Sequence, residues 1–164
     1  MEELFPLVDE AGLVIGKATR SDCHSGSKML HPVVHLHIFN QNGELLLQKR
    51  AMDKDIQPGK WDTSVGGHIN FGESVEEALF REVKEELGLT AFTPVFLRSY
   101  IFESEIEREM VYSYKTVSNG PFHFEHKEIS EIRFWSLAEI NGNTGKSVFT
   151  PNFEDEFHAF VMNY

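Results

Sequence analysis

The chain has 164 residues, of which 41% are hydrophobic and 25% charged, an ordinary composition for a soluble globular domain. Its net charge of −11 disfavours a nucleic-acid partner, because proteins that bind the nucleic-acid backbone need basic surface. Cys23 is the sole cysteine, which excludes a disulfide within the chain, and the N-terminus lacks the apolar core of a signal peptide. No apolar run approaches a membrane span, so we expect one cytoplasmic domain over residues 1–164 with no membrane partner.

The first half of the chain is expected to form short strands joined by polar loops. The expected elements are a hairpin of 4–8 and 13–18, a loop over 20–30, a strand over 33–41, a turn at Asn42-Gly43, a strand over 44–50 and a loop over 51–60. Within 33–41, apolar residues alternate with His35 and His37. We interpret both histidines as satisfied sheet residues, with an i, i+2 pair of ligands as the alternative.

The second half begins with a helix and continues with further strands and helices. The expected elements are a helix that starts after Ser74, strands over 93–102 and 110–117, a turn over 118–121, a strand over 129–135, a short helix over 136–140, a loop over 141–147 and an amphipathic helix over 153–164. Because strands precede and follow one central helix, we expect an α/β (α+β) sandwich built on a mixed sheet.

The central helix carries clear start and stop signals. Ser74 is followed three residues later by Glu77, the arrangement of a capping box, and Gly88 is a typical C-terminal stop. The apolar residues between them recur at helical spacing and predict one buried stripe, made of Val75, Ala78, Leu79, Val83 and Leu87.

Three acidic residues of this helix, Glu82, Glu85 and Glu86, stand at i, i+3 and i+4 and share a face. Like charges at this spacing repel, and a divalent cation with oxygen ligands would neutralise them. The glycine pair Gly66-Gly67 allows backbone to approach such a cation closely. The alternative is an ordinary helix with a solvated acidic face.

Residues 67–89 combine these features in a fixed spacing. Gly67 is followed after five residues by Glu73 and, after seven more, by the run REVKEELGL at 81–89. This stretch resembles the signature of the Nudix hydrolases at every defined position. The resemblance implies an α/β/α sandwich with a loop-helix-loop Nudix box, in which Glu73 and Arg81 shape the site. The ligands it implies for Mg²⁺ or Mn²⁺ are Glu82, Glu85, Glu86 and the Gly67 carbonyl.

Beyond the box, the chain resembles the type I isopentenyl-diphosphate isomerases and their hydrolase-like relatives, from about Phe5 to the C-terminus. The isomerases hold a metal with three histidines and two glutamates. The residues that match this set are His24, His31, His68, Glu107 and Glu109, the last two forming a Glu-x-Glu pair on one face of a strand. The resemblance therefore implies a second site that suits Zn²⁺ or Mn²⁺. It also implies that Arg50 and Lys54 bind substrate phosphate.

The same resemblance shows two departures from isomerase chemistry. Gly66 occupies the position of the cysteine that moves a proton, and glycine has no side chain to do so. Asn152 stands where the isomerases carry a tryptophan whose ring stabilises a carbocation. The scaffold therefore resembles an isomerase, whereas the intact box indicates hydrolysis.

We accordingly expect a metal-dependent diphosphohydrolase, which cleaves a nucleoside diphosphate linked to another moiety or a related small-molecule diphosphate. Glu85 or Glu86 is the expected general base, and Glu128, before the strand over 129–135, is the distal candidate. An isopentenyl-diphosphate isomerase and a non-catalytic diphosphate or nucleotide-sugar sensor are the alternatives. The oligomeric state stays open, with a homodimer as one of the options.

Overall fold

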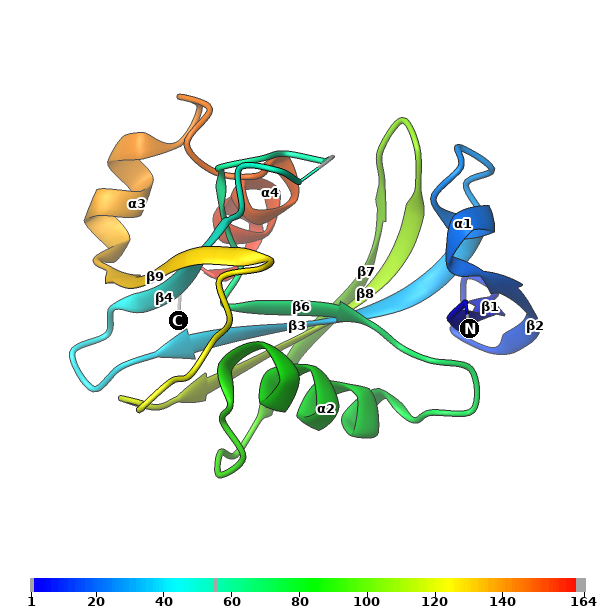
Figure 1. Cartoon of the computed structure of the whole chain (residues 1–164), viewed down its shortest axis with the longest axis horizontal. Coiled ribbons are helices and arrows are strands. Elements are labelled where there is room, and N and C mark those ends of the chain that lie inside the picture. Colours follow the sequence, from blue (N-terminus) through cyan, green and yellow to red (C-terminus); the bar gives the residue numbers. More distant parts are fainter. Residues whose placement is uncertain (1, 55, 162–164) are drawn as a thin grey trace.

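The computed structural model describes residues 2–54 and 56–161, and it has a central sheet with helices on both sides (Figure 1). Its elements in chain order are β1 (Leu4–Val8), β2 (Val14–Thr19), α1 (Arg20–Cys23), β3 (Leu30–Phe39), β4 (Leu45–Arg50), β5 (Trp61–Asp62), β6 (Val65–His68), α2 (Val75–Leu87), β7 (Val95–Glu103), β8 (Arg108–Val117), β9 (Ile129–Trp135), α3 (Leu137–Asn143) and α4 (Pro151–Ala159). Within the described residues, no helix is both long and apolar enough to cross a membrane.

Strand β3 is the centre of the sheet. It pairs in parallel with β8 along its whole length, from Leu30 opposite Arg108 to Phe39 opposite Val117. On its other edge it pairs antiparallel with β6, and β4 joins it only at Phe39. Strand β4 then carries β9 and β5, while β7 extends the sheet beyond β8. The sheet is therefore mixed, and the predicted fold class is confirmed.

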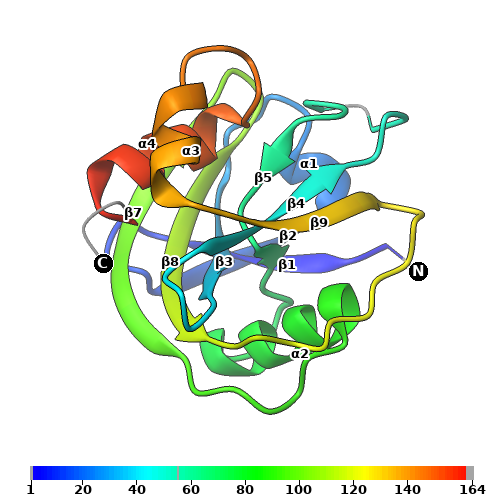
Figure 2. The ribbon, with the colours of Figure 1, turned by 90° about the vertical axis from the view of Figure 1, so that its left-hand side faces the viewer.

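The two faces of the sheet carry separate cores, as the alternation along β3 predicts. Val34, Leu36 and Ile38 face α2 and pack with its apolar stripe. Phe39 belongs to the opposite core, where the terminal helix contributes Phe153 and Phe157. Figure 2 shows this layering, with α2 on one side of the sheet and α3 and α4 on the other. The face on which a β3 side chain lies therefore determines whether it packs against α2 or against α4.

Helix α2 has the predicted ends. The Ser74 side chain accepts a hydrogen bond from the Glu77 backbone N–H (3.1 Å), and the Glu77 carboxylate accepts one from the Ser74 N–H (3.0 Å). Gly88 ends the helix in the left-handed conformation, with φ of 65°. The predicted stripe packs against the sheet. The caps and this packing together fix the direction in which the acidic residues of α2 face.

Several predicted boundaries are wrong. The loop over 20–30 contains α1, because the Thr19 hydroxyl caps the Asp22 N–H (3.2 Å), and β3 already begins at Leu30. That strand ends at Phe39 because the Asn40 side chain accepts hydrogen bonds within the turn. The last helices also differ: α3 continues to Asn143, and α4 starts at Pro151. Residues 162–164 of the predicted terminal helix lie outside the described residues.

A buried polar network joins α4 to the sheet. Glu156, only 1% exposed, accepts hydrogen bonds from His35 Nδ1 and His37 Nε2, each at 2.7 Å, and from the hydroxyls of Tyr100 and Ser113. Each histidine is thus a sheet residue with one ring nitrogen bonded to Glu156, as we interpreted both, although the buried Nδ1 of His37 has no partner among the described residues. Burial works against the charged imidazole, but the Glu156 carboxylate raises the pKa of His35 to about 9.

This network predicts a pH-dependent stability. Folded His35 keeps its proton up to about pH 9, whereas its unfolded pKa is about 6.5, so the free energy of unfolding falls as pH rises through this window. The full change is about 3 kcal/mol at most, since each pKa unit is worth about 1.4 kcal/mol. Urea denaturation between pH 6 and 10 should show this slope, and His35→Gln should flatten it. Exposed His126→Gln is the control, and an equal flattening there would contradict the assignment.

Candidate metal and diphosphate site

An arginine ties the glycine loop, β6 and α2 together. Arg81 donates from Nε and Nη2 to the two Glu73 carboxylate oxygens, at 2.7 and 2.9 Å. Its Nη2 also donates to the His68 carbonyl (2.9 Å), and its Nη1 donates to Glu82 (2.8 Å). Because one planar guanidinium holds all of these groups, the helix face and the end of β6 keep a fixed spacing.

Glu82 meets the backbone of β6 at Gly67, and Glu86 lies beside Glu82. A Cβ at Gly67 would lie 2.2 Å from the Glu82 carboxyl carbon, so only glycine leaves room for this carboxylate. The two glutamate side chains hydrogen-bond each other, and burial raises the pKa of both. Two apposed buried carboxylates need either a shared proton or a cation between them.

The other predicted box ligand, Glu85, is more open. Its side chain is 58% exposed and lies 3.3 Å from Arg81 Nη1. Gln48 is a site residue that the sequence analysis missed: its amide donates to Glu86 (2.9 Å) and to the Ser64 carbonyl (3.0 Å). The signal was present, because Gln48 shares the face of β4 with Leu46, where a polar side chain points toward α2.

These residues fit a hard divalent cation. Carboxylate oxygens and a backbone carbonyl are the ligands that Mg²⁺ and Mn²⁺ prefer, and the Gly67 backbone lies against the Glu82 carboxylate. Burial raises the pKa of Glu82 and of Glu86, and the negative charge of Glu85 adds to the shift of Glu82 as that of Glu82 does to the shift of Glu86, so the site favours a positive charge. The side chains of Glu82, Glu85 and Glu86 would hold the ion together with the Gly67 carbonyl.

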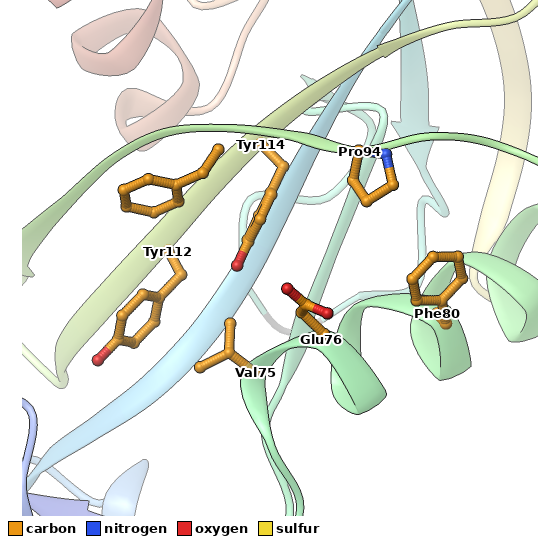
Figure 3. Close-up of a pocket in the computed structure, with 7 residues that line it drawn as sticks. Val75, Glu76, Phe80, Pro94, Tyr112 and Tyr114 are labelled. Atoms are coloured by element: carbon orange, nitrogen blue, oxygen red, sulfur yellow. The ribbon is translucent and has the colours of Figure 1, made fainter.

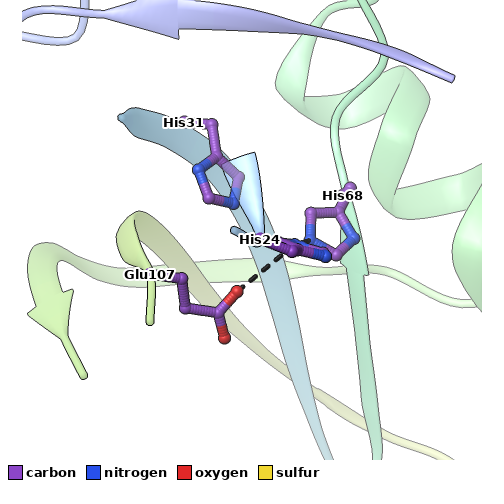
Figure 4. Close-up of side chains that lie close together, drawn as sticks. All are labelled: His24, His31, His68 and Glu107. Atoms are coloured by element: carbon purple, nitrogen blue, oxygen red, sulfur yellow. Dashed lines mark hydrogen bonds and ion pairs between the residues drawn. The ribbon is translucent and has the colours of Figure 1, made fainter. Parts of the chain in front are cut away.

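A second cluster lies on the opposite face of the sheet. The ligand atoms of His24, His31, His68 and Glu107 all lie within 4.8 Å of one another, and Figure 4 shows them converging from β3, β6 and two loops. Glu109 joins them, with its carboxylate 3.9 Å from His31 Nε2 and 3.8 Å from His68 Nε2. The structure therefore brings together all five residues predicted from the resemblance. One detail differs: Glu107 precedes β8 rather than lying within it.

The hydrogen bonds orient these rings toward a common point. His31 Nδ1 donates to the Met29 carbonyl (2.8 Å), which leaves the buried Nε2 as an acceptor without a partner among the described residues. Phe5 stacks on His68 with ring centroids 4.5 Å apart. Burial lowers the pKa of His24 to about 4 and raises that of Glu109 to about 8. Neutral imidazoles with a free ring nitrogen are the form that binds metals.

The predicted phosphate-binding residues lie at the end of β4, where Arg50 is the last residue, and on the loop that follows, which carries Lys54. Arg50 donates to the Ile56 carbonyl (3.0 Å) and lies 3.5 Å from Asp62. Lys54 Nζ lies 3.9 Å from the carboxylate of Glu128, whose side chain is 70% exposed. A backbone hydrogen bond from Ala51 to Glu128 (3.0 Å) brings the two loops together. The structure thus places the distal base candidate beside a substrate-binding candidate, at the surface.

A hollow of about 710 Å³ lies on the other flank of α2 (Figure 3). Its lining is Val75, Glu76, Phe80, Pro94, Phe96, Tyr112 and Tyr114. Glu76 and Phe80 lie on the other side of the buried stripe from Glu82, as their helical spacing dictates. The hollow is therefore distinct from both clusters described above.

Comparison with known proteins identifies the family. The NUDIX domain matches residues 29–153. A protein of Yersinia pestis described as an uncharacterized Nudix hydrolase is 31% identical over 150 residues, 92% of this chain and 81% of that protein. An isopentenyl-diphosphate Delta-isomerase of Photorhabdus laumondii is 32% identical over 161 residues, 94% of this chain and 90% of that protein. The crystal structure of Deinococcus radiodurans DR0079 matches with a TM-score of 0.80 at 26% identity, covering 96% of this chain and 99% of that one. The chain belongs to the Nudix family.

The close approach at Gly67 predicts the effect of a single methyl group. Gly67→Ala should lower the free energy of unfolding by about 1–3 kcal/mol, because the added Cβ overlaps the Glu82 carboxyl. Gly66→Ala is the matched control, since its Cβ would lie 3.4 Å from the nearest atom, His35 Cδ2. Urea denaturation measures both losses. If the double variant Gly67→Ala/Glu82→Ala recovers none of the loss, the proposed overlap is wrong.

Proposed function

We propose that this Nudix protein is a metal-dependent diphosphohydrolase that cleaves a nucleoside diphosphate linked to another moiety, or a related organic diphosphate. The observation that supports it most directly is the Glu82–Glu86 pair, in which Glu82 lies against the Gly67 backbone. All acidic positions of the box are retained: Arg81 binds Glu73, Glu82 and Glu85, and Gln48 binds Glu86. A protein that only senses diphosphates would have no need for this costly arrangement of buried carboxylates.

The chain's own residues divide the work of hydrolysis. A divalent cation held by Glu82, Glu85, Glu86 and the Gly67 carbonyl would neutralise diphosphate charge and lower the pKa of a bound water. Glu85 or Glu86 would take the proton of the attacking water, with Glu128 as the distal alternative. Arg50 and Lys54 would hold the anionic phosphates against the overall charge of −11.

We further propose that His24, His31, His68, Glu107 and Glu109 bind a second ion, Zn²⁺ or Mn²⁺. The support is the convergence of the five side chains and the buried Nε2 of His31, which lacks a partner among the described residues. An imidazole and carboxylate set with one hydrogen-bonded ring nitrogen suits these metals.

This cluster is also the observation that favours the second candidate function, an isopentenyl-diphosphate isomerase. The structure gives two arguments against it. Gly66 offers no side chain for proton transfer, and the Asn152 side-chain amide lies 3.1 Å from the Tyr100 hydroxyl where a carbocation would need an aromatic face. We therefore favour hydrolysis.

Hydrolysis is tested by a product screen with Mg²⁺ or Mn²⁺. The panel holds nucleoside di- and triphosphates, nucleotide sugars, and isopentenyl and dimethylallyl diphosphates, with products identified by mass spectrometry. We expect cleavage at a diphosphate and a loss of kcat of at least about a hundredfold in Glu82→Gln. Glu76→Gln, on the other flank of the same helix, should stay within about twofold. Interconversion of the prenyl diphosphates without cleavage would refute the hydrolase.

The second ion is tested by metal content. After Zn²⁺ loading and dialysis, His31→Gln should contain one equivalent of Zn²⁺ less than the wild type by plasma mass spectrometry, because a ligand of the cluster is lost. His126→Gln, an exposed histidine elsewhere, should bind as much Zn²⁺ as the wild type. Equal metal content in His31→Gln and the wild type would rule out the cluster as a Zn²⁺ site.

A further inference from the structure

Two side chains join the acidic face of α2 to the segment of β6. Arg81 makes one connection, through its hydrogen bond to the His68 carbonyl (2.9 Å). Gln48 makes the other, because its side-chain nitrogen donates both to Glu86 Oε1 (2.9 Å) and to the Ser64 carbonyl (3.0 Å). Ser64 immediately precedes β6 and His68 is the last residue of that strand. The two connections therefore hold α2 against β6 at both ends of the strand.

The partners of Gln48 fix the orientation of its amide. A backbone carbonyl can only accept a hydrogen bond, so the group that lies beside the Ser64 carbonyl must be the NH₂ and not the oxygen of the amide. The same nitrogen lies beside the Glu86 carboxylate, so each of its two N–H groups has a partner. Rotation or exchange of the amide ends would cost both hydrogen bonds, and the side chain is therefore held in one position.

Ser64 is itself anchored to the centre of the sheet. It is 0% exposed, and its hydroxyl donates to the Leu46 carbonyl and accepts from the Ile38 N–H (2.9 Å). Leu46 lies on β4 two residues before Gln48, and Ile38 lies on β3. The amide of Gln48 thus projects toward α2 from a buried, hydrogen-bonded frame. A side chain held in this way orients its partner with little freedom of its own.

The choice of an amide at this position preserves the negative charge of the box. Arg81 binds Glu82 and Glu85, so it already cancels part of the charge on that side of the helix. Gln48 is a neutral donor, and its hydrogen bond orients the Glu86 carboxylate without cancelling the charge. A lysine or arginine in its place would compete with a divalent cation for this carboxylate. Gln48 therefore suits a carboxylate that must stay available as a metal ligand.

We propose that Gln48 is a positioning residue for the box metal: anchored on the Ser64 carbonyl, it holds the Glu86 carboxylate in the orientation in which it binds the cation together with Glu82. This rests on the proposed function in taking the box as the site of a divalent cation. Gln48 acts through Glu86 and does not itself bind the cation. Hydrogen-bond partners of metal ligands commonly contribute about ten- to a hundredfold to metal affinity, and we expect an effect of this size here.

The test measures Mn²⁺ affinity from the electron paramagnetic resonance signal of free Mn²⁺, with His31→Gln present throughout so that the His/Glu cluster does not contribute. Gln48→Met keeps the size of the side chain but removes the donor, and it should weaken Mn²⁺ binding by about tenfold or more. In combination with Glu86→Ala the same change should have an effect of less than about twofold, because Gln48 acts through Glu86. Gln41→Met, the same change in an exposed turn, is the matched control and should leave the affinity unchanged. No weakening in Gln48→Met, or equal weakening with and without Glu86, would overturn the proposal.

A second measurement uses the wild type and does not depend on how the variants fold. In ¹H–¹⁵N spectra, Mg²⁺ should shift the side-chain NH₂ signal of Gln48, whose acceptor becomes a metal ligand, and leave that of Gln41 in place. An unshifted Gln48 signal at saturating Mg²⁺ would refute the proposal. Neither readout needs turnover, so a failure to find hydrolysis does not affect them. Equal Mn²⁺ affinity with and without Glu86→Ala would contradict the box as the metal site, and the role of Gln48 with it.

Discussion

The close approach of α2 to the end of β6 is the constraint on which the rest of the structure depends. Gly67 lets the Glu82 carboxyl lie where a side chain would otherwise be, and Arg81 fixes the distance by binding Glu73, Glu82 and the His68 carbonyl at once. The capping box at Ser74 and the buried stripe of α2 set the rotation of the helix. Together they hold buried carboxylates beside backbone, an arrangement that is stable only with a compensating proton or cation.

The strand β6 serves both faces of the sheet with consecutive residues. Gly67 faces α2 and the box glutamates, whereas Gly66 and His68 face the other side, with His35 and the His/Glu cluster. Because side chains alternate along a β-strand, these three adjacent residues contribute to two polar sites on opposite faces of the sheet. The residues that resemble the isomerases and those that form the box thus lie on opposite faces of the sheet, joined through the Arg81 bond to the His68 carbonyl.

Sequence analysis correctly predicted the features that depend only on a local pattern of residues. The capping box, the stop at Gly88 and the alternation along β3 follow from local periodicity, and the structure has them all. The five-residue His/Glu cluster came only from the resemblance, because its members lie up to 85 positions apart and no local rule joins them. Glu156 was missed, since its role depends on which strand lies opposite α4, whereas Gln48 could have been found from the strand face that it shares with Leu46. Single capping side chains such as Thr19 and Thr150 set the boundaries of α1, α3 and α4. Sequence patterns alone do not show which of several candidate residues forms the cap.

The most direct test of the central claim is an anomalous-scattering crystal structure with Mn²⁺ and methylenediphosphonate. We predict a manganese peak between the Glu82 and Glu86 carboxylates and the Gly67 carbonyl, in contact with a phosphonate oxygen. A structure with the analogue bound and manganese only at the His24, His31 and His68 cluster would contradict the assignment of the box as the catalytic metal site.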